Sequence, residues 1–141
     1  MKTIQTGLVA AIISTFLASG AHAYTDEDSY VAVSGTAMGV TGDIQFDDFS
    51  ITFANGKTLS FSGLVSDTFV VDGDEVPASV YRVDRPGDPK LENGNRLCGS
   101  GAVTYIANWD AGGDRSVVAV FTGDEAPSSD EEMCASYVYE Q

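Results

Sequence analysis

Hydrophobic and polar positions alternate with a period of two over much of this chain. Residues 49–53 alternate apolar side chains with serine and threonine, and residues 59–62 do the same. Between the two runs lies Asn55-Gly56, a pair typical of tight β-hairpin turns. The pattern therefore predicts two antiparallel strands joined at this turn.

The same logic predicts strands along the rest of the chain. Asp72-Gly73-Asp74 and residues 111–114 are turn sequences that would join two further hairpins. The expected strands outside the first hairpin are residues 30–33, 67–71, 79–83, 102–109, 116–122 and 134–139. The strand at residues 30–33 could extend toward Val40. About eight short strands with no convincing helix predict an all-β fold: a single antiparallel meander that forms a small barrel or sandwich.

The first 23 residues are typical of an export signal. Lys2 is the only charged residue, residues 7–18 are apolar, and Ala21-His22-Ala23 fits a small-x-small cleavage site. We therefore expect a signal peptide at 1–23 and one β-barrel-like domain at 24–141. The expected location is the periplasm, with secretion as the alternative. Nothing after the signal is long and apolar enough for a membrane-spanning helix.

Two cysteines remain in the expected mature chain, Cys98 and Cys134. An even number of cysteines in an exported protein predicts a disulfide. The loop that it would close is worth about 4 kcal/mol in the chain-entropy model. We expect a structural crosslink, because the spacing is unlike that of a redox-active Cys-x-x-Cys pair.

The mature chain is strongly acidic. Removing Lys2 with the signal leaves six basic residues against 21 acidic ones, a net charge of −15. Such a charge disfavours binding to nucleic acid and favours a cationic partner, whose association would weaken with salt. Adaptation of the surface to a salty habitat is the alternative explanation.

Several enzyme classes are excluded by the composition. His22, the only histidine, lies in the signal segment, so the mature chain has no imidazole for a catalytic triad or an ordinary zinc site. Carboxylate pairs such as Asp47-Asp48 could serve a glycosidase, but they lie in expected turns. Residues 71–75 and 110–114 carry oxygen ligands without the spacing of a calcium loop. We expect no enzymatic activity, no cofactor and no metal.

A basic segment stands out in this acidic chain. Four of the six mature basic residues lie within residues 82–96, where two prolines stiffen the chain. Tyrosine and arginine often anchor interfaces, so this segment is a candidate contact surface. Local pairing with Asp84, Asp88 and Glu92 on a solvated loop is the alternative. The candidate partner-binding residues are Tyr81, Arg82, Arg85, Lys90 and Arg96. The acidic loop 123–133 could also meet a cationic partner.

Two resemblances extend this interpretation. Residues 93–99, 103–105, 119–123 and 134–137 resemble segments of a group of small, uncharacterised exported bacterial proteins, which implies no activity. The expected architecture also resembles that of the periplasmic C-type lysozyme inhibitors, which are small disulfide-bonded β-barrels. That family's Ser-Gly-x-x-Tyr motif is not reproduced, because Ser66 stands at the tyrosine position after Ser62-Gly63. No inhibitory residue is therefore carried over.

These observations predict a non-enzymatic periplasmic binding protein, such as an inhibitor of a cationic protein like lysozyme. A lipocalin-like carrier of a small apolar ligand and a structural protein of the cell envelope are the alternatives.

Overall fold

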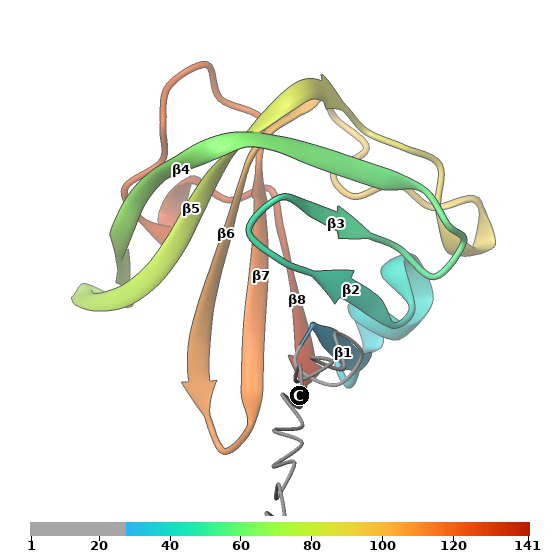
Figure 1. Ribbon diagram of the computed structural model, residues 1–141, viewed down its shortest axis with the longest axis horizontal. Helices are drawn as coiled ribbons and strands as arrows, with labels where there is room; N and C mark the ends of the chain where they lie inside the picture. Colours follow the sequence, from blue (N-terminus) through green and yellow to red (C-terminus); the bar gives the residue numbers. More distant parts are fainter. Residues whose placement is uncertain (1–27) are drawn as a thin grey trace, which may run out of the picture.

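The computed structural model describes residues 28–141, in which eight antiparallel strands close into a barrel (Figure 1). Each strand pairs with the next along the chain, and β8 pairs back with β1. The all-β meander is thus confirmed, in the form of a barrel. The strands are β1 (Ser29–Ala32), β2 (Ile44–Phe46), β3 (Ser50–Thr52), β4 (Thr58–Val71), β5 (Asp74–Gly87), β6 (Val103–Gly112), β7 (Arg115–Phe121) and β8 (Ala135–Glu140).

The three predicted hairpins are confirmed. Asn55-Gly56 lies between β3 and β4, Asp72-Gly73 joins β4 to β5, and Gly113-Asp114 joins β6 to β7. Asp72 and Gly73 both have positive φ angles, of 51° and 85°. A two-residue turn needs such angles to match the twist of its strands, which explains the Asp-Gly sequence.

The division into strands differs from the expected one in several places. The expected strands 59–62 and 67–71 belong to a single strand, β4, whose register against β5 shifts at Phe61/Gly63 and again further along. Such bulges bend a strand without ending it. The strand β2 was not expected, because three residues are too few to show an alternation.

The first strand does not extend toward Val40. The chain instead forms a short π-helix, η1 (Ala37–Thr41), that covers one end of the barrel. Ala37 and Thr41 are fully buried, and the Thr41 hydroxyl lies 2.6 Å from that of Tyr139. A helical turn places Ala37 and Thr41 on the same buried face, which explains why the strand does not continue through these residues. Within residues 28–141, no helix is long and apolar enough to cross a membrane.

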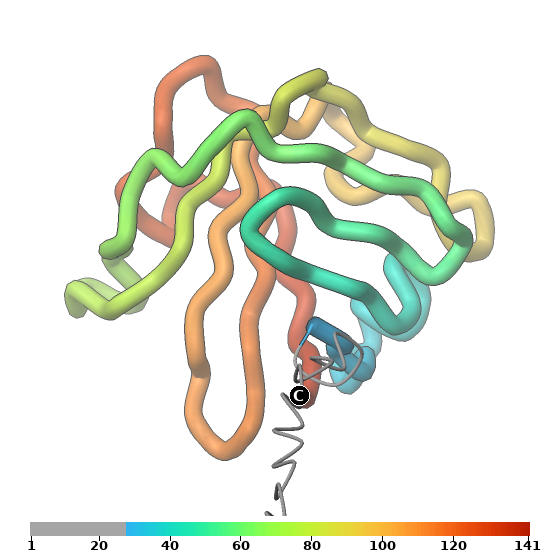
Figure 2. Tube along the Cα trace, viewed as in Figure 1, coloured from blue at the N-terminus to red at the C-terminus, as the bar shows by residue number. Residues whose placement is uncertain are grey.

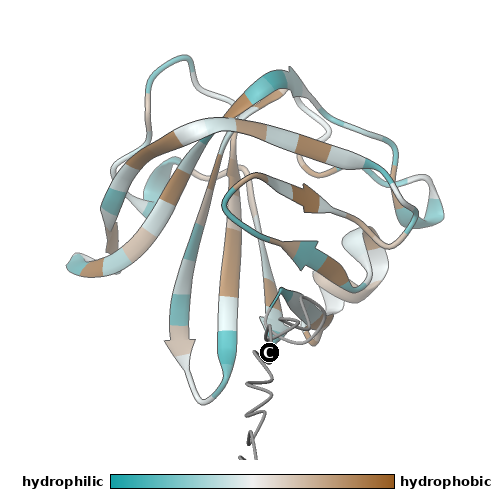
Figure 3. Ribbon diagram, viewed as in Figure 1, coloured by the Kyte–Doolittle hydropathy of each residue, from teal (hydrophilic) through white to brown (hydrophobic). Residues whose placement is uncertain are grey.

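Side chains fill the barrel interior. Figure 3 shows apolar and polar residues interspersed along β4 and β5. The buried side chains of Leu59, Tyr81 and Val83 on these strands belong to one large core cluster. Aromatic rings in this cluster meet edge to face, an arrangement favoured by their charge distribution. The aromatic members are Tyr30, Phe46, Phe53, Tyr81, Tyr137 and Tyr139, with Phe61 packed against them.

A second core cluster lies on the other face of the β5–β7 sheet. The distal part of the β4–β5 hairpin, residues 66–78, curls over this face and inserts Phe69 against Trp109 and Phe121. Its backbone is attached to the loop before β8, because the Val70 N–H donates to the Ser128 carbonyl (3.0 Å). We call residues 66–78 the hairpin arm.

The barrel end covered by η1 also carries the predicted disulfide. Cys98 and Cys134 are bonded, with their Cα atoms 5.7 Å apart. The carboxylate of Asp88 accepts the backbone N–H groups of Leu97, Cys98 and Gly99, which orders this loop. In Figure 2 the loop between β5 and β6 lies on the same side of the molecule as η1. We call this side the capped end. The expected signal peptide lies outside the described residues.

Candidate functional site

A pocket of about 240 Å³ opens near the β2–β3 turn. Strand pairing places it away from the capped end, because Ser79 and Asn108 face each other on β5 and β6, whereas Gly87 pairs with Val103 near the disulfide loop. Three of the lining residues are aspartates and two are tyrosines, and we call this pocket the acidic mouth. The lining residues are Asp28, Tyr30, Phe46, Asp47, Asp48, Ser79, Tyr81 and Asn108.

The turn that carries two of these aspartates is held by its own hydrogen bonds. Asp47 Oδ1 accepts the backbone N–H groups of Phe49 (2.7 Å) and Ser50 (2.9 Å), as aspartate often does at the start of a turn. Asp48 Oδ1 accepts the hydroxyl proton of Tyr81 at 2.6 Å. The carboxylates are therefore fixed in place before any ligand arrives.

The tyrosines of the acidic mouth stay protonated at neutral pH. Burial, with a contribution from the hydrogen bond to Asp48, raises the pKa of Tyr81 to about 12. Burial also raises the pKa of Tyr30, and the nearby charge of Asp28 acts in the same direction. Negative charge at the acidic mouth thus comes from carboxylates, which can accept the N–H groups of an ammonium or guanidinium ion.

The five predicted partner-binding residues do not form one surface. Tyr81 is 3% exposed and lines the acidic mouth, whereas Arg82, its neighbour on β5, points to the opposite face of the sheet. Arg85 borders a different groove with β4 residues 58–60. Lys90 and Arg96 lie at the capped end: the Lys90 carbonyl accepts from Asn55 Nδ2, and Arg96 donates to the Asp88 carbonyl.

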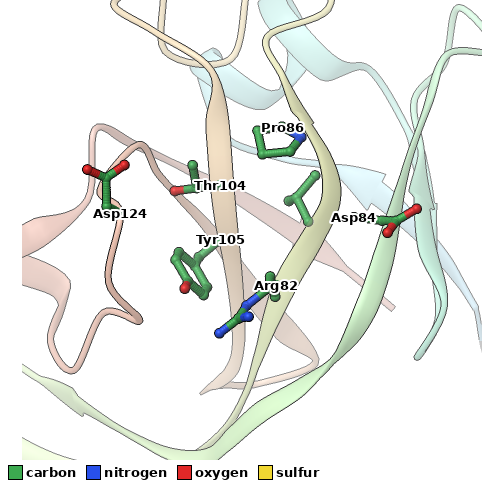
Figure 4. Close-up of a pocket in the computed structure, with 7 residues that line it drawn as sticks. Arg82, Asp84, Pro86, Thr104, Tyr105 and Asp124 are labelled. Carbon is green, nitrogen blue, oxygen red and sulfur yellow. The ribbon is translucent and has the colours of Figure 1, made fainter.

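The outer face of β5 and β6 carries a second hollow, of about 320 Å³ (Figure 4). The guanidinium of Arg82 lies 5.7 Å from the ring centre of Tyr105, a cation–π distance. Asp124 lies across the hollow, and Asp84 points to the other side of β5. Thr104 and Pro86 also line this shallow hollow. Because its lining carries both an arginine and aspartates, it favours no single class of ligand as clearly as the acidic mouth does.

Within the described residues, the basic segment forms no ion pair with Asp84, Asp88 or Glu92, which was the alternative expected from the sequence. Between residues 28 and 141, the ion pair at contact distance joins Arg115 to Glu140, both exposed. Asp88 instead uses its carboxylate on backbone N–H groups of the disulfide loop. The guanidinium groups of Arg82 and Arg85 thus form no ion pair with the described acidic residues.

The sequence pointed to Tyr81 and to the Asp47-Asp48 pair, but it did not predict that they line one pocket. Asp28, Ser79 and Asn108 were missed, because each carries no signal of its own and joins the pocket only through strand pairing. Nowhere in the described chain do three His, Cys, Asp or Glu side chains converge as a metal site. The acidic mouth therefore presents carboxylates, hydroxyls and one amide to a ligand.

Comparison of the chain with protein-family models, curated proteins and solved structures gave no match.

Proposed function

We propose that this protein is a non-enzymatic binding protein of the periplasm that binds a cationic protein, such as a lysozyme, through the acidic mouth. The observation that carries the proposal is the pocket itself, in which three aspartates and two tyrosines surround about 240 Å³. A lysine or arginine side chain fits this chemistry, because its charged head can donate hydrogen bonds to the carboxylates.

The charge of the whole chain supports the same partner. A net charge of −15 on the expected mature chain attracts a basic protein over distance and repels polyanions. The basic residues Arg85, Lys90 and Arg96 lie toward the capped end, away from the acidic mouth. This separation would orient an approaching cationic protein toward the aspartates.

The filled interior speaks against the alternative of a lipocalin-like carrier. A carrier needs an enclosed apolar space for its ligand, whereas the large core cluster occupies the inside of this barrel. An apolar ligand would have to displace side chains such as Phe46 and Tyr139. The proposed function is therefore recognition at the surface.

Calorimetric titration of the mature, oxidised protein with a C-type lysozyme tests the proposal, with lytic activity measured in parallel. We expect submicromolar one-to-one binding with loss of lysis. The double variant Asp28→Asn/Asp48→Asn should weaken binding at least tenfold, and Asp124→Asn/Glu125→Gln is its control with the same change in charge on an exposed loop. An absence of binding, or equal effects of the two variants, would contradict recognition through the acidic mouth.

The predicted basic contact surface is tested in the same titration. If that segment meets the partner, Arg82→Ala and Arg85→Ala should weaken binding more than Asp28→Asn/Asp48→Asn does. If the acidic mouth is the site, the two arginine variants should bind lysozyme as the unmodified protein does, or slightly more tightly because the net charge becomes more negative.

A further inference from the structure

An apolar surface adjoins the acidic mouth. Phe49, at the tip of the β2–β3 turn, is 77% exposed, and Leu64 on β4 is 55% exposed. The half-buried Phe61 links the two: its N–H donates to the Phe49 carbonyl (2.8 Å), and its ring stacks on Tyr81 with centres 4.6 Å apart. Leu64 is the cross-strand partner of Tyr81. We call Phe49, Phe61 and Leu64 the apolar rim.

Phe49 is held on a fixed backbone although its ring contributes little to the core. Its N–H donates to Asp47 Oδ1, its carbonyl accepts from Phe61, and the neighbouring Asp48 is bonded to Tyr81. A side chain on an ordered turn loses less conformational freedom on binding than one on a flexible loop. Aromatic residues, phenylalanine included, are enriched at protein interfaces relative to the rest of the surface.

We propose that the apolar rim docks against an apolar surface of a cationic protein, with Phe49 as the anchor, beside the basic side chain that enters the acidic mouth. This inference rests on the proposed function and narrows the partner. The partner must carry an apolar surface next to a lysine or arginine. A flexible polycation offers the positive charge but no apolar surface for Phe49. The aspartates next to Phe49 disfavour an anionic membrane, because they would be brought against lipid phosphates.

The arrangement resembles the general anatomy of protein interfaces, in which apolar anchors lie beside polar groups that set orientation. Here the two parts should act on different quantities. The aspartates should govern the salt dependence of binding, and the uncharged rim should govern affinity at every salt concentration.

The test is calorimetric titration of a C-type lysozyme with the mature protein and with Phe49→Ala, Leu64→Ala and Met38→Ala, at low and physiological salt. Met38→Ala is the matched control, because Met38 is 58% exposed but lies on η1 at the capped end. We expect Phe49→Ala to weaken binding at least tenfold with an unchanged salt slope. Leu64→Ala should have a smaller effect in the same direction, and Met38→Ala should have none. Phe49→Leu, which keeps an apolar side chain, should restore part of the affinity.

Each outcome decides between the two proposals. If the unmodified protein binds lysozyme and Phe49→Ala binds equally well, the apolar rim is overturned while the proposed function stands. If poly-L-lysine binds as tightly as lysozyme, the rim is overturned as well. If the unmodified protein does not bind lysozyme, both proposals fail together. Thermal unfolding of each variant checks that the barrel is intact.

Discussion

Tyr81 belongs to both the core and the acidic mouth. Its ring stacks on Phe61 inside the barrel, and its hydroxyl reaches Asp48 at the pocket. The sequence pattern indicated a strand residue with an aromatic side chain, which is typical of a core position. Its hydrogen-bond partner, 33 positions earlier in the chain, could not be predicted, because strand pairing brings the two together.

Replacing Tyr81 by phenylalanine tests this bond. Tyr81→Phe removes the donor and keeps the ring, so we expect the free energy of unfolding to fall by about 1 kcal/mol, the net value of a partly exposed hydrogen bond. Chemical denaturation measures the change. Tyr105→Phe is the control, because Tyr105 is a similarly buried tyrosine whose ring faces Arg82 and not the acidic mouth. Equal effects of the two variants would contradict a specific role for the Tyr81–Asp48 bond.

The buried tyrosines should make the fold sensitive to alkaline pH. Burial raises the pKa of Tyr81 and of Tyr137 to about 12, and it raises the pKa of Tyr139 further. In the unfolded chain these groups ionise near pH 10. A folded pKa above the unfolded one means that this stability is complete below pH 10 and is lost as pH rises from 10 toward 12.

Ultraviolet titration of tyrosinate measures this shift directly. In the native protein, the absorbance of Tyr81, Tyr137 and Tyr139 should appear only above pH 11, together with unfolding. In urea all tyrosines should titrate near pH 10. Reversible titration of every tyrosine near pH 10 in the native protein would contradict their burial.

Among the elements, the hairpin arm is the part that strand patterns describe least well. The sequence predicted its turn at Asp72-Gly73 and its first strand at residues 67–71, and the fold confirms both. The return strand was expected only from residue 79, whereas β5 already begins at Asp74. The bulges in β4 and the insertion of Phe69 against Trp109 were not predicted. Period-two alternation identifies the two faces of a strand, but it does not say that a second core lies on the outer face of a barrel.

Removing Phe69 tests whether the hairpin arm is packed as described. Phe69 is 2% exposed and contacts Trp109 and Phe121. Phe69→Ala should therefore destabilise the protein by about 3–5 kcal/mol, the usual effect of a large cavity. Emission of Trp109, the only tryptophan, should shift to the red as its covering is removed. Val65→Ala, at an exposed position of the same strand, should change neither quantity; a stability loss below about 1 kcal/mol for Phe69→Ala would show that the arm is not packed this way.

The molecule combines a strongly acidic chain with a closed barrel whose strand ends form the acidic mouth. The sequence predicted an all-β meander, as a barrel or a sandwich, and the Cys98–Cys134 disulfide, because alternation and cysteine number are local or countable signals. It did not predict that Asp28, Asp48 and Tyr81 meet in one pocket away from the capped end. A site assembled from strand ends leaves no motif in the chain.

Recognition through the acidic mouth is tested most sharply by the association rate of a C-type lysozyme with the mature protein, measured by stopped flow over a range of salt concentrations. If the acidic mouth draws in a cationic partner, the rate should fall steeply as salt rises, and the fall should be shallower for Asp28→Asn/Asp48→Asn than for Asp124→Asn/Glu125→Gln. A rate that does not depend on salt, or an equal salt dependence for the two double variants, would contradict recognition of a cationic partner through the acidic mouth.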